Sequence, residues 1–275
     1  MNDSRLRRPS AVRTLRVGEL KVSYVPDGAM LLKPAGTPPG TADGPGSGYG
    51  AHLNDTRRLV ANTGGLLVEF RGRALLIDAG FGPRAVPEDP GDPGRGAVHG
   101  GSLPGNLALL GRSPEDIETV AFTRLRPDRT GWACVDPPLF TRADFVIHKA
   151  AWDPRDPVVA ALGPRTRPVL AGDEVFPGVH ALALPGDGAE QGGFVIASHG
   201  TRLLAFGDAL VSSLQIRHPE WSAVPDADPA RSAHDRRLLI AELLRPDTLG
   251  FGIRFADVVF GRVRPHGTGA VWHPL

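Results

Sequence analysis

Three arginines and one aspartate share a short stretch of this sequence, Phe122-Thr123-Arg124-Leu125-Arg126-Pro127-Asp128-Arg129-Thr130-Gly131-Trp132. Guanidinium groups are planar, permanently charged donors that bind the oxygens of carboxylates, phosphates or enolates, and they can stabilise an oxyanion. The carboxylate of Asp128 lies among them and could serve as a general base. The stretch therefore indicates a pocket for an anionic or carbonyl-bearing small molecule.

Other charged residues could complete such a pocket. The three that follow strand or turn patterns are Asp187, Asp208 and Arg254. A carboxylate among arginines is kept ionised, and the same effect lowers its basicity. We therefore expect Asp128 and Asp208, with Arg124, Arg126 and Arg129, to form the catalytic group, and Arg254 and Asp187 to bind substrate.

Two further residues are weaker substrate-binding candidates. His148 follows a strand pattern, although a surface histidine is the commoner case, and Trp132 could line an apolar pocket, although tryptophan is more often core. A Ser–His pair of Ser212 or Ser213 with His218 has no motif to support it. The remaining histidines show no metal-ligand spacing.

With its three arginines replaced by histidine, the stretch would be T-H-L-H-P-D-H-T-G-W. In that form it is similar to the zinc-binding signature of the metallo-β-lactamase-like hydrolases, in the lactonase and methyl parathion hydrolase-like branch. The resemblance spans roughly residues 59–275, and its landmarks follow the family's order. They include Asp78 in an I-D-x-G-x-G pattern, Asp208 in a G-D pattern and Arg254 at the place of the last histidine.

The resemblance implies that the metal ligands have been replaced. Of the seven usual ligands, the aspartates at 128 and 208 remain, whereas the five histidines read Arg124, Arg126, Arg129, Asp187 and Arg254. A guanidinium has no lone pair to offer a metal and its pKa exceeds ~12. We therefore expect no zinc or iron centre and no other cofactor. An ordinary zinc lactonase with unusual ligands is the least favoured alternative.

The replacements could preserve the charge of the site. Two zinc ions with two aspartates and a hydroxide carry +1, as do four arginines with Asp128, Asp187 and Asp208. Paired in this way, buried ions would avoid the cost of several kcal/mol for an unpartnered charge. Two interpretations follow: a repurposed pocket in a metal-independent enzyme that performs hydrolysis, cyclisation or elimination, or a salt-bridge cluster in a pseudoenzyme that binds an anionic metabolite or a protein partner.

The fold implied by the resemblance is a four-layer αββα sandwich of the α/β (α+β) class, in one domain over residues 1–275. Strand patterns at 12–17, 20–25, 65–70 and 74–77 predict two hairpins, and the pattern at 229–244 predicts the longest helix. We expect residues 1–10 to be frayed. Residues 33–58 and 83–101 are rich in proline and glycine and predict long loops, the first a candidate lid.

Composition excludes several classes of partner. The 31 basic and 30 acidic residues leave a net charge of +1, so we expect no nucleic-acid partner. No apolar run predicts a membrane span or a secretory signal, and the single cysteine, Cys134, excludes an internal disulfide. These features predict a cytoplasmic protein with a small, anionic ligand, and they leave monomer and homodimer open.

Overall fold

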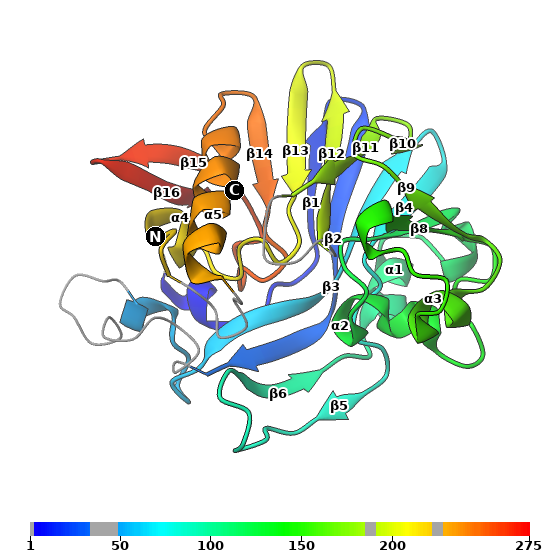
Figure 1. Ribbon diagram of the computed structural model, residues 1–275, viewed down its shortest axis with the longest axis horizontal. Coiled ribbons are helices and arrows are strands. Elements are labelled where there is room, and N and C mark those ends of the chain that lie inside the picture. Colours follow the sequence, from blue (N-terminus) through cyan, green and yellow to red (C-terminus); the bar gives the residue numbers. More distant parts are fainter. Residues whose placement is uncertain (1–2, 34–48, 185–190, 222–227) are drawn as a thin grey trace.

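The computed structural model describes residues 3–33, 49–184, 191–221 and 228–275. Two β-sheets pack face to face, and helices cover the outer face of each sheet (Figure 1). This arrangement confirms the predicted four-layer αββα sandwich. Of the helices in these residues, none is both long and apolar enough to cross a membrane.

The first sheet has the strand order β5-β6-β2-β3-β4-β7-β8-β9 within the described residues, with β1 paired to β2. Strands β4, β7, β8 and β9 run parallel, whereas the other neighbours are antiparallel. The strands are β1 (Arg13–Val17), β2 (Leu20–Leu32), β3 (Leu59–Phe70), β4 (Arg73–Ile77), β5 (Ala85–Val86), β6 (Arg95–His99), β7 (Thr119–Phe122), β8 (Asp144–His148) and β9 (Thr166–Val169).

The second sheet runs in chain order from β10 to β16 within the described residues. All its neighbours are antiparallel except β13 and β14, which are parallel and are connected through the longest helix. The strands are β10 (Glu174–Phe176), β11 (Val179–Ala183), β12 (Gly192–Ser198), β13 (Thr201–Ala205), β14 (Thr248–Phe251), β15 (Phe260–His266) and β16 (Gly269–Pro274).

The α-helices and the 3-10 helices lie outside the two sheets or in the loops at their edges. The α-helices are α1 (Leu103–Leu109), α2 (Pro127–Thr130), α3 (Pro157–Leu162), α4 (Leu214–Arg217) and α5 (Pro229–Leu243). The 3-10 helices are η1 (Asp3–Arg7), η3 (Tyr49–His52), η4 (Pro114–Asp116), η5 (Gly131–Cys134) and η6 (Lys149–Ala151).

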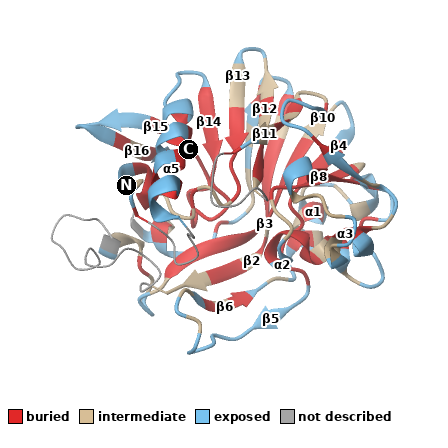
Figure 2. Cartoon of the chain, in the orientation of Figure 1, coloured by how far each residue is buried: buried red, intermediate tan, exposed pale blue. Residues whose placement is uncertain are grey.

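Three apolar clusters hold the layers together. The largest fills the space between the sheets, where residues such as Leu66 and Phe194 are fully buried. A second packs α1 and α3 on the first sheet, and a third packs α5 on the second. Figure 2 shows the buried residues along the strands and on the inward sides of the helices. Burial of this kind is the main favourable term in folding.

Several predictions about the ends and loops are wrong. Residues 3–7 form η1, not a frayed end, because Leu6 is buried and Arg5 Nε donates to the carbonyl of Asp257 at 2.9 Å. Residues 83–101 contain β5 and β6, because β6 finds a partner in the long strand β2. Residues 34–48 lie outside the described residues, so the lid remains a prediction.

The helix predicted at 229–244 is present, and its buried face includes charged residues. Arg236 and Asp235 are buried, whereas Leu238 is 47% exposed. The guanidinium of Arg236 reaches the loop before the helix, where Nε donates to the carbonyl of Pro219 at 2.8 Å. A tertiary hydrogen bond of Arg236, and not only the spacing of apolar residues, therefore decides which face of this helix is buried.

Candidate functional site

The charged site residues come together because parallel strands end at one edge of each sheet. Asp78 directly follows β4, and α2, which carries Asp128 and Arg129, follows the neighbouring parallel strand β7. Asp208 and Arg254 follow β13 and β14, which are the parallel pair of the second sheet. The five positions span 177 residues of sequence, from Asp78 to Arg254, and meet where the two sheets face each other.

Two arginines and two aspartates alternate in a buried network, the ion-pair quartet of Asp128, Arg129, Asp208 and Arg254. Asp208 Oδ1 accepts hydrogen bonds from Arg129 Nη2 and from Arg254 Nε, the second at 2.9 Å. Arg254 Nη2 donates to Asp128 Oδ2. Arg254 Nη1 donates to the carbonyl of Asn62 at 3.1 Å, so this guanidinium is held on three sides.

Burial and charge oppose each other in the quartet, and charge prevails. The side chain of Arg129 is 0% exposed and those of the other three members are at most 9% exposed. Burial raises the pKa of Asp208, but the nearby charges of Arg129 and Arg254 outweigh it and the pKa is lowered. The pKa of Asp128 is lowered in the same way. Both carboxylates are therefore ionised and weakly basic.

A third carboxylate, Asp78, borders the quartet without joining its hydrogen bonds. Thr123 donates to it through its backbone N–H at 2.9 Å and through its hydroxyl at 2.8 Å, and Arg129 Nη1 lies 3.4 Å from Asp78 Oδ2. Burial raises the pKa of Asp78 to about 6, against the charge of Arg129. Its backbone adopts a φ of 62°, a conformation that non-glycine residues rarely keep without a reason.

The remaining arginines of the motif, Arg124 and Arg126, lie outside the quartet and nearer to solvent, and we call them the rim arginines. The Arg126 side chain is 45% exposed, and its Nε is 3.6 Å from Asp128 Oδ1, which is too long for a hydrogen bond. Arg124 is half-buried and forms no hydrogen bond or ion pair with any residue that the structure describes. Asp187, which the sequence predicts to bind substrate, lies outside the described residues. The four predicted arginines therefore form two groups. Arg129 and Arg254 are buried in the quartet, whereas Arg124 and Arg126 lie outside it.

His148 is not a surface histidine. Its ring packs against Phe194, with 5.0 Å between ring centroids, and its Nε2 is buried without a partner among the described residues. A Cβ on Gly192 would lie 2.1 Å from that Nε2, so only glycine leaves room for the ring. Burial lowers the pKa of His148 to about 4, which makes it a neutral group in the wall beside the site.

Trp132 has a structural partner. Its indole Nε1 donates to Asp27 Oδ1 at 2.7 Å. Asp27 is buried and also accepts four backbone N–H donors, those of Phe81, Gly82, Gly101 and Leu103. The carboxylate therefore fixes the loops after β4 and before α1 to the motif helix, and it leaves Trp132 without a free polar end for a substrate.

Two structural residues of the site escaped the sequence analysis. Asp27 gives a weak signal, because it interrupts an apolar strand pattern after a proline. Asn62 gives none, yet it donates to the carbonyls of Ile253 and Ala256 at 3.2 and 2.6 Å and so holds the loop that carries Arg254. Buried amides of this kind are recognised only once their carbonyl partners are known.

The donor set does not fit a dinuclear zinc centre. Zinc needs thiolate, imidazole or carboxylate lone pairs in tetrahedral array. Here the carboxylates are occupied by guanidinium groups, which have no lone pair and carry the charge of the metal they would meet. In the described part of the chain, no group of three His, Cys, Asp or Glu side chains is placed to hold a metal ion.

Comparison with solved structures identifies the fold. The chain superposes on AidC, a dizinc quorum-quenching lactonase, with a TM-score of 0.75 over 97% of this chain and 98% of that one, at 17% identity. For the hydrolase AbOPH of the beta lactamase superfamily the TM-score is 0.77, covering 98% and 99% of the two chains at 17% identity. The chain has the metallo-β-lactamase fold.

A third neighbour has the same extent. A probable metal-dependent hydrolase from Staphylococcus aureus gives a TM-score of 0.75 over 95% of this chain and 99% of that one, at 16% identity. No protein-family profile matches the chain, and a search among curated proteins finds no match. The resemblance inferred from the motifs is therefore confirmed at the level of the fold.

Proposed function

We propose that this chain is a metal-independent protein of the metallo-β-lactamase fold that binds an anionic small molecule through Arg124 and Arg126. One observation carries the proposal. The quartet balances its own charges, with two arginines on two aspartates, whereas the rim arginines have no carboxylate within hydrogen-bond distance among the described residues.

The position of the rim arginines suits a ligand better than it suits folding. A half-buried guanidinium keeps part of its water, so an arriving carboxylate or phosphate meets a donor that is only partly desolvated. Bidentate guanidinium–carboxylate pairs are among the stronger hydrogen bonds in proteins. Arg124 and Arg126 lie two residues apart between β7 and α2, and we propose that one anion contacts both.

The proposed independence from metal rests on the chemistry of the quartet. Arg129 and Arg254 occupy one carboxylate oxygen of Asp208 and one of Asp128, and their charge repels a dication. Elemental analysis of protein purified without chelator, and again after addition of zinc, should find well under one equivalent bound. A stoichiometric metal that survives gel filtration would overturn this part of the proposal.

The ligand proposal can be tested with a matched pair of probes. The product bound to AidC is N-hexanoyl-L-homoserine, a carboxylate, and the corresponding lactone is its uncharged counterpart. By calorimetry, the acid should bind and the lactone should bind at least ~10-fold more weakly, since a charge-assisted pair contributes ~1.5–3 kcal/mol.

Variants locate that binding. Arg124→Gln and Arg126→Gln should each weaken binding of the acid by ~10-fold or more. Arg264→Gln, on the exposed part of β15, is the control and should leave binding unchanged. Equal binding of the acid by all four proteins would overturn the proposal, as would equal binding of acid and lactone by the unmodified protein.

A second candidate function is catalysis with Asp128 as the general base. One of its two carboxylate oxygens favours this function. Asp128 Oδ1 accepts no hydrogen bond from a described residue, and it faces Arg126 at 3.6 Å. It could take a proton from a water held near the rim, although its lowered pKa makes it a weak base. Turnover of lactones or phosphotriesters that Asp128→Asn abolishes, with binding of the acid retained, would favour catalysis over binding alone.

A further inference from the structure

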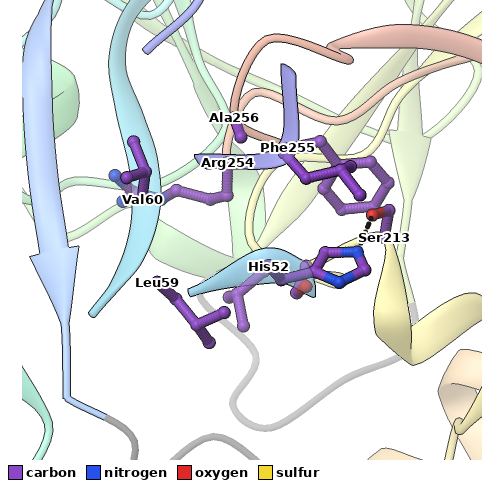
Figure 3. A pocket seen from close by; sticks show the side chains of 10 residues that line it. His52, Leu59, Val60, Ser213, Arg254, Phe255 and Ala256 are labelled. Atoms are coloured by element: carbon purple, nitrogen blue, oxygen red, sulfur yellow. Dashed lines mark hydrogen bonds between the residues drawn. The ribbon is translucent and has the colours of Figure 1, made fainter. Parts of the chain in front are cut away.

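A small hollow lies between η3 and the turn that begins α4, with Arg254 in its lining (Figure 3). Its volume is about 10 Å³, which is the space for one water molecule. Most of its lining is apolar, from Leu6, Leu59, Val60, Val211, Phe255 and Ala256. The polar groups that reach it are those of His52, Ser212, Ser213 and Arg254.

A serine and a histidine face each other in this hollow. Ser213 Oγ lies 3.4 Å from His52 Nε2, and Figure 3 shows the imidazole turned toward the hydroxyl. Both residues are half-buried, so solvent and a small reagent can reach them. Distances slightly beyond an ordinary hydrogen bond are common between a nucleophile and its base before substrate binds.

The fold holds the two residues from both sides. Leu53 and Leu214, which directly follow His52 and Ser213, are buried in one apolar cluster with Leu59 and Trp221. Leu53 also forms a β-bridge with Leu59. The pair is therefore set on two segments that share a core, although 161 residues separate its members in the sequence.

The serine turn is further fixed by a single glutamine. Gln215 Oε1 accepts from the backbone N–H groups of Val211 and Ser212, at 2.7 and 3.3 Å, and its amide donates to the carbonyl of Trp221 at 2.9 Å. The segment that carries His52 is held by Arg7, whose Nε donates to the carbonyl of Ala51 at 3.0 Å. A nucleophile placed by such contacts loses little freedom when it reacts.

His218, the histidine considered from the sequence as a partner for Ser212 or Ser213, has other contacts in the structure. Its ring stacks on Trp221, with centroids 4.1 Å apart and planes inclined by 8°, and its Nδ1 lies 3.3 Å from Glu220. The sequence could not indicate His52, because it follows a breaker-rich segment and lies far from any serine in the chain.

We propose that Ser213 and His52 form a second reactive site, a serine esterase centre for short-chain carboxylic esters. Ser213 is the nucleophile and His52 its general base. The backbone N–H of Ser213 donates no hydrogen bond within the described residues, so it can donate to the oxyanion that forms on its own side chain. The inference does not depend on the arginine site.

The reaction needs only water as a second reactant. Ser213 Oγ bonds to the acyl carbon while its proton passes to His52 Nε2, which gives a tetrahedral oxyanion. The oxyanion collapses, the bond to the ester oxygen breaks, and the alcohol leaves with the proton that His52 returns. Water then attacks the acyl-serine with the same base, and the carboxylic acid and the free hydroxyl are released.

The size of the hollow selects the acyl group. The hollow is small and is lined by Leu59, Val60 and Phe255, so we expect a short acyl group to fit it better than a long one. Ester specificity should therefore decrease as the acyl chain lengthens, which is opposite to the trend of an apolar groove.

The first test uses the full chain and a fluorophosphonate probe. The probe forms an O–P bond to a reactive serine, expels fluoride and leaves the proton with the base, so intact mass and peptide mapping identify the residue. Labelling should map to Ser213 and not to Ser212, and Ser213→Ala should abolish it. His52→Ala should slow it by ~100-fold, the usual contribution of a general base.

Controls separate chemistry from folding. Ser102→Ala and His266→Ala change exposed residues far from the hollow and should label at the rate of the unmodified protein. Thermal melting of each variant shows whether it is folded. If Ser213→Ala fails to fold, the unmodified protein still decides the matter, because the probe should block hydrolysis of p-nitrophenyl acetate in proportion to the Ser213 labelled.

The outcomes are unambiguous. Hydrolysis of p-nitrophenyl acetate should exceed that of the octanoate by at least ~10-fold in kcat/KM, and both should require Ser213. Labelling at another residue, labelling that is equal in folded Ser213→Ala, or hydrolysis that survives complete labelling would overturn the proposal. Loss of binding in the Arg124 and Arg126 variants would not affect these results, so the two proposals fail separately.

Discussion

Two arginine–aspartate clusters of this molecule differ in the solvent exposure of their arginine side chains. The quartet alternates two arginines with two aspartates, and no member has a side chain more than 9% exposed. The second, the Asp257 cluster, gathers Arg5, Arg8 and Arg13 around the carboxylate of Asp257. In that cluster only the aspartate is buried, and the arginine side chains are 27 to 57% exposed.

This difference in exposure decides what happens to the remaining charged residues when one residue of a cluster is removed. In the quartet the remaining partners are buried and cannot return to water, so each residue is needed by the others. In the Asp257 cluster the arginines can turn into solvent at little cost. The inner cluster therefore behaves as a closed element of the core, whereas the outer one attaches the N-terminal segment to the second sheet.

The largest expected effect is that of Asp208→Asn. The change leaves Arg129 and Arg254 facing a neutral amide, and an uncompensated buried charge costs ~3–5 kcal/mol. Urea denaturation followed by circular dichroism should show a loss of that size in the free energy of unfolding. A loss below ~1 kcal/mol would mean that the quartet is solvated and that the contrast with the outer cluster is false.

The next largest expected effect is the pH dependence that His148 gives to the free energy of unfolding. Its pKa in the native protein is about 4, below the ordinary ~6.5, so between these values the unfolded chain binds a proton that the native one refuses. Its contribution to stability is therefore lost as pH falls from ~6.5 to ~4, by about 3 kcal/mol at ~1.4 kcal/mol per unit.

His148→Gln isolates this contribution. Asp78, whose native pKa is raised to about 6, acts with the opposite sign over the same range and partly masks it in the unmodified protein. The difference in unfolding free energy between protein and variant removes the Asp78 effect and should rise with pH. A difference that stays constant from pH 4 to 6.5 would show that the imidazole is solvated in the native state.

A smaller loss is expected for Asp257→Asn, about 1–2 kcal/mol. The amide still accepts hydrogen bonds, and the three arginines it releases are already partly in water. The same denaturation experiment measures it beside Asp208→Asn. If both variants lose the same free energy, burial of the arginines is not what distinguishes the clusters.

The sequence predicted the quartet better than it predicted the rim. Asp128, Arg129, Asp208 and Arg254 could be assigned together because strand ends and motif order fix where the backbone delivers them. Which way a long side chain turns is set by its neighbours, so Arg124 and Arg126 could not be separated from Arg129 in advance. The flexible stems of arginine leave that choice to packing.

Pairs that depend on loops were not predictable. The contact of His52 with Ser213 joins two segments without a periodic pattern, and that of Asp27 with Trp132 joins a strand to a 3-10 helix far along the chain. The same holds for η1, because polar residues at a terminus predict fraying unless the one carboxylate that fixes them, Asp257, is known. Local patterns thus predicted the first two hairpins and the longest helix, whereas long-range polar contacts had to be observed.

The smallest expected effect is that of Arg8→Ala. The Arg8 side chain is 57% exposed and shares Asp257 with two other arginines, so its loss should cost less than ~1 kcal/mol at low salt. At 1 M salt, where screening reaches ~3 Å, the cost should disappear, whereas the effect of Asp208→Asn should persist because buried pairs are screened much less. Chemical denaturation of both variants in urea at low and high salt would test this. An Arg8 effect that persists at 1 M salt would place the outer cluster with the quartet, as an element closed to water.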